Sequence, residues 1–315
     1  MEEDGELEEA GGAQFRSVIL PFIIFTGIWG STWIVIRDQL GVVPPEWSVA
    51  YRFIIAAAAM ALIARIKGRP LILDRGGFTA AAVIGISQFY GNYSSVYFAE
   101  RHVTSGIVAV IFALLLIPNT LLGWAFLGQR PRGRFVVGSA LAMIGIVLLC
   151  IHELRSNPAP AADVLAGFGF TAVAILCASV SNVYQAREHV RRHHLSSLLA
   201  WAMAIGALVD ALLAWFRFGP PVFDPRPGYW IGLVYLAVFA SALAFSLYYP
   251  VVRKIGPAKS AYSSVLVPVI AMALSTAFEH YRWTALAVAG AVLTFAGMLL
   301  AMSRGRSVVQ SPDAA

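Results

Sequence analysis

The chain alternates long runs of apolar residues with short polar segments. Ten of these runs are long enough to cross the hydrocarbon core of a bilayer, which takes about 20 helical residues. Because a helix satisfies its own backbone hydrogen bonds in lipid, the pattern predicts an all-α polytopic membrane protein with ten transmembrane helices. The predicted spans are residues 18–39, 47–65, 78–98, 104–127, 135–151, 164–186, 197–216, 229–252, 260–278 and 283–302.

The two halves of the chain repeat each other. Residues 97–149 return in looser form as residues 249–300, with Pro118 and Pro268 at equivalent positions. An apolar helix with two glycines seven residues apart follows each proline, and upstream three polar residues match at the same spacing. The glycine pairs are Gly138 with Gly145 and Gly290 with Gly297, and the polar residues are Ser31, Thr32 and Arg37 against Ser181, Asn182 and Arg187.

Five spans in each half is an odd number, so the second repeat has to enter the membrane in the opposite orientation from the first. The sequence therefore predicts two inverted five-helix repeats, at residues 17–152 and 163–303, joined by a linker at residues 153–162. Residues 1–16 are predicted to form a disordered acidic cytosolic tail, and residues 304–315 a second cytosolic tail.

Composition and charge agree with a membrane protein. The mean hydropathy is +0.73 and only 13% of residues are charged, against about a quarter in soluble domains. The basic residues form no continuous patch, so the net charge of +6 does not predict nucleic-acid binding. With the N-terminus in the cytosol, 16 of the 23 basic residues fall in cytosolic segments. The pattern predicts a multi-pass protein of the cell (inner) membrane with both termini cytosolic.

Several short motifs follow one another along the chain: Trp29-Gly30-Ser31-Thr32, Tyr51-Arg52-Phe53, Tyr97-Phe98-Ala99, the two prolines, and Glu279 before a helix with paired glycines. In this order they resemble the motifs of the drug/metabolite transporter superfamily, and most closely those of its EamA-type ten-helix group. The resemblance implies that the first, third, fourth, sixth, eighth and ninth helices enclose a central cavity, with the fifth and tenth packed behind. Two positions depart from the family pattern: Thr32 replaces an asparagine and Gln129 replaces a glutamate.

Polar and aromatic residues at helical spacing are the candidate substrate contacts. Gln88 and Asn92 lie on one face of the third span, and the sixth span repeats such a face. These residues either line a cavity or bond neighbouring helices to each other. The predicted substrate-binding residues are Trp29, Thr32, Trp33, Gln88, Asn92, Ser181, Asn182, Tyr184, Gln185, Ser241 and Phe245.

Charged residues are rare inside the predicted spans. Arg52 either pairs with neighbouring groups or acts as an outer gate, and Asp210 either pairs structurally or couples protons to transport. Glu279, at a helix end, is interpreted as a solvated or capping group. Phosphates and dicarboxylates need cations at their site, and none is predicted in the floor of the cavity. Aromatic walls with a few amides instead suit a small neutral or zwitterionic solute.

Gly30, Pro118 and Pro268 are candidate hinges. Each proline removes a backbone hydrogen bond and so loosens its helix, although glycine and proline are also common in membrane helices without such a role. Hinges of this kind would serve alternating access between the two sides of the membrane.

The sequence thus predicts a secondary transporter that exports small neutral or zwitterionic metabolites such as amino acids. Its expected partners are a small-molecule substrate and the lipid bilayer, as a monomer or a homodimer. No metal or cofactor is expected, since arginines surround the histidines at 189–194. A passive channel or facilitator is the alternative, and a polytopic enzyme is disfavoured because no catalytic motif occurs.

Overall fold

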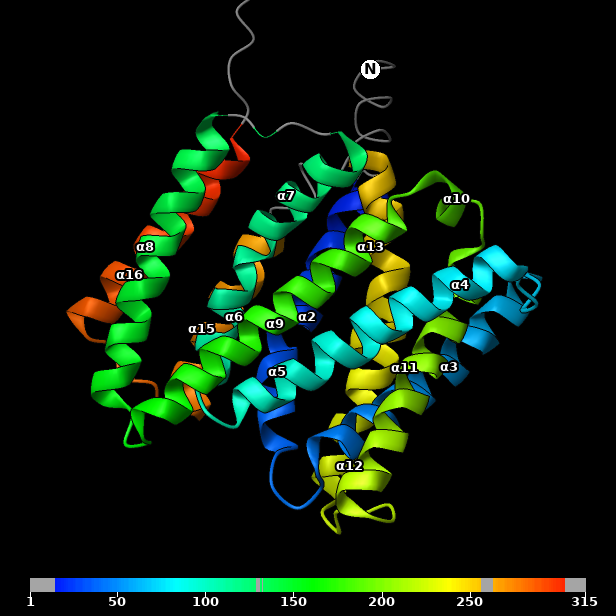
Figure 1. Cartoon of the computed structure of the whole chain (residues 1–315), viewed down its shortest axis with the longest axis horizontal. Helices are drawn as coiled ribbons and strands as arrows, with labels where there is room; N and C mark the ends of the chain where they lie inside the picture. Colours follow the sequence, from blue (N-terminus) through cyan, green and yellow to red (C-terminus); the bar gives the residue numbers. More distant parts are fainter. Residues whose placement is uncertain (1–14, 129–130, 132, 256–262, 304–315) are drawn as a thin grey trace, which may run out of the picture.

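The computed structural model describes residues 15–128, 131, 133–255 and 263–303 (Figure 1). Within these ranges the regular structure is helical, without a strand. The first repeat contains η1 (Phe15–Ile19), α2 (Leu20–Asp38), α3 (Pro45–Ile66), α4 (Arg75–Ile84), η2 (Gly85–Asn92), α5 (Tyr93–Glu100), α6 (Ser105–Phe112), η3 (Ala113–Leu115), α7 (Leu116–Leu127) and α8 (Gly133–Ser156). The second contains α9 (Ala161–Gln185), α10 (Glu188–Arg191), α11 (Leu195–Phe218), α12 (Pro227–Val234), η4 (Tyr235–Leu243), α13 (Ala244–Ile255), α15 (Ser263–Phe278) and α16 (Ala285–Met302).

Eight helices of the described chain are long and apolar enough to cross a membrane. The third predicted span lies on the more polar series α4, η2 and α5, and the ninth on α15, whose apolar part is the shorter Val265–Phe278. The all-α polytopic membrane fold is therefore confirmed, while ten crossings and cytosolic termini stay predictions. The tails before residue 15 and after residue 303, and the start of the ninth span at 260–262, lie outside the described residues.

Reciprocal contacts between α8 and α16 show that the two repeats are inverted. A Cβ added at Gly138 would lie 2.5 Å from the carbonyl oxygen of Gly297, and one added at Gly297 would lie 2.5 Å from that of Gly138. Gly145 and Gly290 meet in the same way one step along the pair. The two helices thus pack antiparallel with their backbones in contact, as small residues allow in membrane bundles. Each repeat offers the same face to the other.

The third span of each repeat contains a π-helix: η2 in the first repeat and η4 in the second. A π-turn shifts backbone pairing by one residue and so changes which side chains face inward. In η4 the Ser241 hydroxyl donates to the carbonyl of Leu236, five residues back, at 2.9 Å. The sequence pattern gave no sign of either π-helix.

The paired helices α8 and α16 lie along one side of the molecule in Figure 1, and α3 packs against α11 on the opposite side. The remaining long helices fill the space between them. This is the arrangement that the family resemblance implies, with the fifth and tenth spans behind the central helices.

The three candidate hinges differ in their local structure. A 3₁₀ turn, η3, lies directly before the turn of α7 that holds Pro118, whereas α15 continues through Pro268. Pro118 cannot donate to a carbonyl four residues back, which accounts for the tightened helix there. A Cβ at Gly30 would lie 2.6 Å from Ile270 of α15, so this glycine lets α2 approach α15. Their role as hinges stays a prediction.

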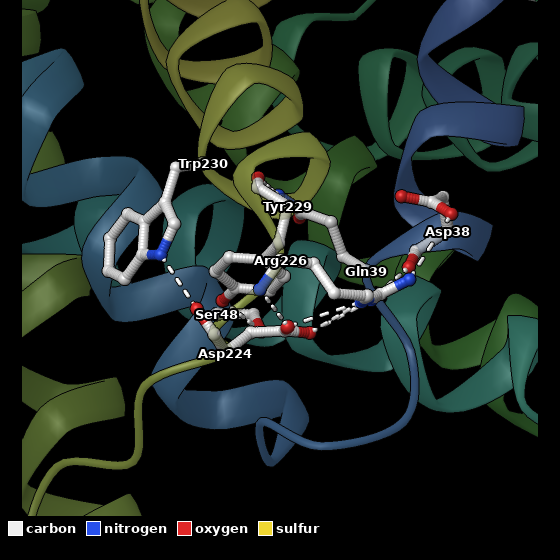
Figure 2. Close-up of polar contacts among 7 residues, drawn as sticks. All are labelled: Asp38, Gln39, Ser48, Asp224, Arg226, Tyr229 and Trp230. Atoms are coloured by element: carbon white, nitrogen blue, oxygen red, sulfur yellow. Dashed lines mark hydrogen bonds and ion pairs between the residues drawn. The ribbon is translucent and has the colours of Figure 1, made fainter.

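Polar contacts fix the turn between α11 and α12 to the end of α2 (Figure 2). Arg226 binds Asp224 at 2.8 Å and donates to the backbone carbonyl of Asp38 at 3.1 Å. Trp230 donates to the Asp224 carbonyl at 2.8 Å, and Ser48 bonds the Tyr229 hydroxyl at 2.8 Å. The guanidinium of Arg226 holds the pKa of Asp224 below its usual value. We call this end of the bundle the outer end, because the loop charges predict that it faces away from the cytosol.

Replacing Gly297 with alanine should weaken the packing of α8 on α16. The new methyl group would meet the Gly138 carbonyl at 2.5 Å, and overpacking of this kind costs about 1 to 3 kcal/mol. We expect a lower thermal unfolding midpoint for the purified protein in detergent, followed by tryptophan fluorescence. Gly169→Ala is the matched control, since a Cβ there has nothing within 4 Å. Equal midpoints for the two variants would contradict the close contact.

Asp224→Asn should lower stability at neutral pH and lose that effect in acid. Because the native pKa of Asp224 is depressed, its stabilisation is present above the unfolded value of about 3.9 and fades as the pH falls through the native value. Unfolding midpoints of wild type and variant should therefore differ at neutral pH and converge in acid. Asp38→Asn is the control, since Asp38 lies farther from Arg226, at 3.6 Å. A difference that grows on acidification would be the opposite result.

Candidate functional site

A cavity of ≈ 210 Å³ lies among the central helices, lined by both repeats. The first repeat contributes residues from α2, η2, α5, α6 and η3, and the second from α9, α13 and α15. These elements belong to the first, third, fourth, sixth, eighth and ninth predicted spans, the six that the family resemblance implies. The lining residues are Trp29, Thr32, Trp33, Ile36, Gln88, Asn92, Tyr93, Val96, Ala109, Phe112, Ala113, Leu115, Ala178, Asn182, Phe245, Tyr248, Ser263, Val267 and Pro268.

Seven of the eleven predicted substrate-binding residues line this cavity. They are Trp29, Thr32, Trp33, Gln88, Asn92, Asn182 and Phe245. Among the candidate hinges, Pro268 also lines it. Sequence reasoning missed much of the wall, including Phe112 and Tyr93, because an aromatic residue in an apolar span gives no signal of which way it faces.

Three polar atoms in the cavity wall are buried without a hydrogen-bond partner in the described part of the chain. They are Trp33 Nε1, Gln88 Oε1 and Asn92 Oδ1. Buried polar groups normally have partners, and leaving one unpaired costs about 1 to 3 kcal/mol. A ligand in the cavity would find one fixed donor, the indole N–H, and two amides able to donate or accept.

Aromatic rings form much of the remaining wall. The Trp29 ring lies 5.5 Å from that of Phe245 and 5.1 Å from that of Tyr248, measured between centroids, and Trp33 lies 5.4 Å from Phe112. The Trp29 indole donates to the Ala240 carbonyl of η4 at 3.1 Å, which fixes its orientation. None of the described lining residues is charged. The cavity therefore offers apolar contact and a few hydrogen bonds, without a fixed charge.

The other four predicted substrate-binding residues do not line the cavity. Gln185 donates to Ser181 on its own helix at 3.0 Å, and the Tyr184 ring packs edge-on against His189 at 5.7 Å. Ser241 is fully buried in η4. These side chains contact neighbouring protein groups instead, and Ser241 bonds another long helix, through Arg52 of α3.

Arg52 lies buried behind the cavity wall. Its guanidinium stacks over Tyr93 at 4.4 Å and donates to Ser241 Oγ at 3.3 Å, while Nη1 has no hydrogen-bond partner among the described residues. Because Tyr93 lines the cavity and Ser241 belongs to η4, Arg52 connects the two repeats. Cation–π contact of this kind stabilises a buried guanidinium by roughly 2 kcal/mol.

Asp210 lies in the interface between α11 and α5, away from the cavity. The hydroxyl of Ser94 donates to its Oδ1 at 2.5 Å, and no partner for Oδ2 occurs in the described chain. The carboxyl group is fully buried. Its geometry is that of a structural pair, and a coupling role stays a prediction.

Polar contacts join the helices at the outer end, beyond the cavity lining. Glu279 accepts hydrogen bonds from the Ser105 N–H at 3.2 Å and the Ser105 hydroxyl at 2.5 Å, and its carboxylate lies 3.5 Å from Arg37 Nε. Next to them, the Tyr97 hydroxyl donates to Gln39 Oε1 at 2.6 Å. Glu279 therefore caps a helix, α6, that belongs to the other repeat. A sequence alone does not reveal a cap across two repeats.

No metal site was found in the described part of the chain, where no three histidine, cysteine or acidic side chains come together as possible ligands. The two cysteines, Cys150 and Cys177, are free and half-buried.

Comparison with known proteins agrees with this architecture. Protein PagO of Salmonella typhimurium is 22% identical over 84% of this chain and 86% of its own length. A probable amino-acid metabolite efflux pump of the same species is 24% identical, over 87% and 90%. The uncharacterized inner membrane transporter YedA of Escherichia coli K12 is 26% identical, over 88% of each chain. A crystal structure that covers 90% of this chain superposes with a TM-score of 0.66 at 20% identity, which shows the same fold.

The model of the EamA-like transporter family matches residues 16–151 and again residues 165–303, so that both repeats are covered. With its many apolar helices and its inner-membrane relatives, the protein is a multi-pass inner-membrane transporter. It belongs to the EamA-like transporter family.

Proposed function

We propose that the protein is a secondary transporter that exports small neutral or zwitterionic metabolites, with amino acids as the leading class. The substrate would bind in the central cavity, and the two repeats would expose that cavity to each side of the membrane in turn. Inverted repeats that enclose a site at mid-membrane are the usual basis of such alternating access.

The observation that carries the proposal is the lining of the cavity. Both repeats supply it, its walls are aromatic, and its unpartnered polar atoms are one indole N–H and two amide oxygens. A solute with a small apolar body and a few donors and acceptors would satisfy them. A phosphate or dicarboxylate would lose its hydration without gaining a cation from the described lining residues.

The similar proteins support export as the direction of transport and amino acids as the class of solute. One relative is named as a probable amino-acid metabolite efflux pump, both in Salmonella typhimurium and in Escherichia coli K12. Identities of 24% leave room for a different substrate within the same class.

The state described by the structure is consistent with one half of a transport cycle. Glu279, Arg37 and Ser105 join the repeats at the outer end, so opening toward that side would require these contacts to break. Gly30, Pro118 and Pro268 are the places where we propose that helices bend as the repeats move. The alternative, a passive channel or facilitator, would need no such alternation.

Asn182→Ala should impair transport, whereas Gln185→Ala should not. Asn182 lines the cavity, and Gln185 is an amide on the same helix that bonds Ser181 instead. Loss of one substrate hydrogen bond worth about 1 kcal/mol should weaken apparent affinity roughly fivefold. The measurement is counterflow in proteoliposomes loaded with a panel of amino acids, nucleosides and sugars.

Two results of this assay would contradict the proposal. Equal counterflow in Asn182→Ala and wild type would remove the cavity from the transport path. Net flux without counterflow would favour the channel, because acceleration by solute on the opposite side requires a carrier that alternates.

A further inference from the structure

Three glutamates gather at the outer end, each from a different helix end. Glu100 is the last residue of α5, Glu153 lies in the last turn of α8, and Glu279 directly follows α15. The exposed fraction is 0% for Glu100 and 4% for Glu153, and the side chain of Glu279 is 10% exposed. Carboxylates are seldom buried this far unless they are paired or protonated.

The three carboxyl groups differ in their hydrogen-bond and ion-pair partners. Glu279 has the Ser105 N–H, the Ser105 hydroxyl and Arg37, and Glu153 accepts from Asn157 at 3.4 Å. Both carboxyl oxygens of Glu100 are buried, and neither has a hydrogen-bond partner among the described residues. Glu100 is therefore the one of the three whose carboxyl oxygens both lack a hydrogen bond among the described residues.

The charged groups that interact electrostatically with Glu100 are Glu279, Arg37 and Arg52. Both arginines are engaged elsewhere: Arg37 with Glu279, and Arg52 with Ser241 and Tyr93. Neither forms an ion pair with Glu100 in the described part of the chain. Glu153 of α8 interacts electrostatically with Glu279 and Tyr281. Tyr97 lies one turn before Glu100 on α5 itself.

An ionised Glu100 would thus be a buried negative charge next to a second one. Two carboxylates in such a position do not both ionise readily, and a proton bound to the pair removes the repulsion. The proton would sit on a Glu100 oxygen, since Glu279 already accepts three hydrogen bonds and faces a guanidinium.

We propose that Glu100 and Glu279 form a proton-binding site within the outer gate, and that the proton resides on Glu100 while the Glu279 contacts are closed. Opening the gate would bring water to Glu100, and the group would release its proton there. The use of that proton in transport rests on the proposed function, but the site itself does not.

The inverted counterpart of this site is missing from the sequence. Gln129 occupies the position that corresponds to Glu279, and residues 249–252, which correspond to 97–100, contain no acid. An amide cannot take up a proton near neutral pH. The corresponding positions of the other repeat therefore cannot form a proton site of this kind.

The test is infrared difference spectroscopy of the purified protein, titrated between about pH 5 and pH 9, where buried glutamates release their protons. Subtracting the spectrum of Glu100→Gln from that of wild type should leave the absorbance of one protonated carboxyl group, which disappears as the pH rises. Glu279→Gln should shift the midpoint of that titration downward, because the neighbouring negative charge is gone. Subtraction also removes the signal of buried Asp210, which all three proteins share.

Glu153→Gln is the matched control, a buried glutamate at the same end that has its own hydrogen bond. It should leave the Glu100 signal in place. A wild-type minus Glu100→Gln spectrum without a protonated carboxyl band would overturn the proposal and make Glu100 an ionised counter-ion of the arginines. If the band appears but no solute shows counterflow, the proton site stands and the transport proposal fails; counterflow without the band gives the reverse.

Discussion

Lipid supplies no hydrogen-bond partner, so every polar group within this bundle depends on another part of the protein or on the cavity. Many polar groups that the sequence places inside the spans are satisfied by a neighbouring helix, of the same or the opposite repeat, or by their own helix. Tyr97 bonds Gln39 within the first repeat, while Arg52 bonds Ser241 and Asp210 accepts from Ser94 across the repeats. Those that remain unpaired in the wall of the cavity, such as Trp33 and Asn92, are the groups available to a solute.

Two of the contacts between the repeats differ in kind, and they lie in different places. The glycine contacts of α8 and α16 are close and made by backbone atoms, so they have little freedom to change. The contacts of Glu279 at the outer end are hydrogen bonds from Ser105 and an ion pair with Arg37, which can break and be replaced by water. Under the proposed alternating mechanism, the outer end would open while the glycine pair stays closed.

Hydropathy and the repeat were enough to predict the helical membrane fold, because apolar length and spacing are properties of the chain itself. The reciprocal glycines Gly138 and Gly297 were visible for the same reason, although which atoms they would meet was not. Helical spacing placed Gln88 and Asn92 on a common face, and both line the cavity. Helical spacing also selected Gln185 and Ser241, but these two do not line the cavity. Their partners lie on their own helix or on α3, because periodicity says which side chains share a face and not what that face meets. The π-helices could not be predicted either, because a pattern of apolar and polar positions does not show where backbone pairing shifts by one residue.

The reciprocal seam between α8 and α16 has a consequence for how such a molecule is assembled. If the two repeats were separate proteins, every copy would find a partner only if the cell inserted equal numbers in each orientation. Joining the units in one chain fixes that ratio at one to one and replaces a search in the membrane with an intramolecular encounter, at an effective concentration on the order of millimolar. The linker before α9 therefore keeps the two repeats in equal number, and the glycines let their faces pack closely.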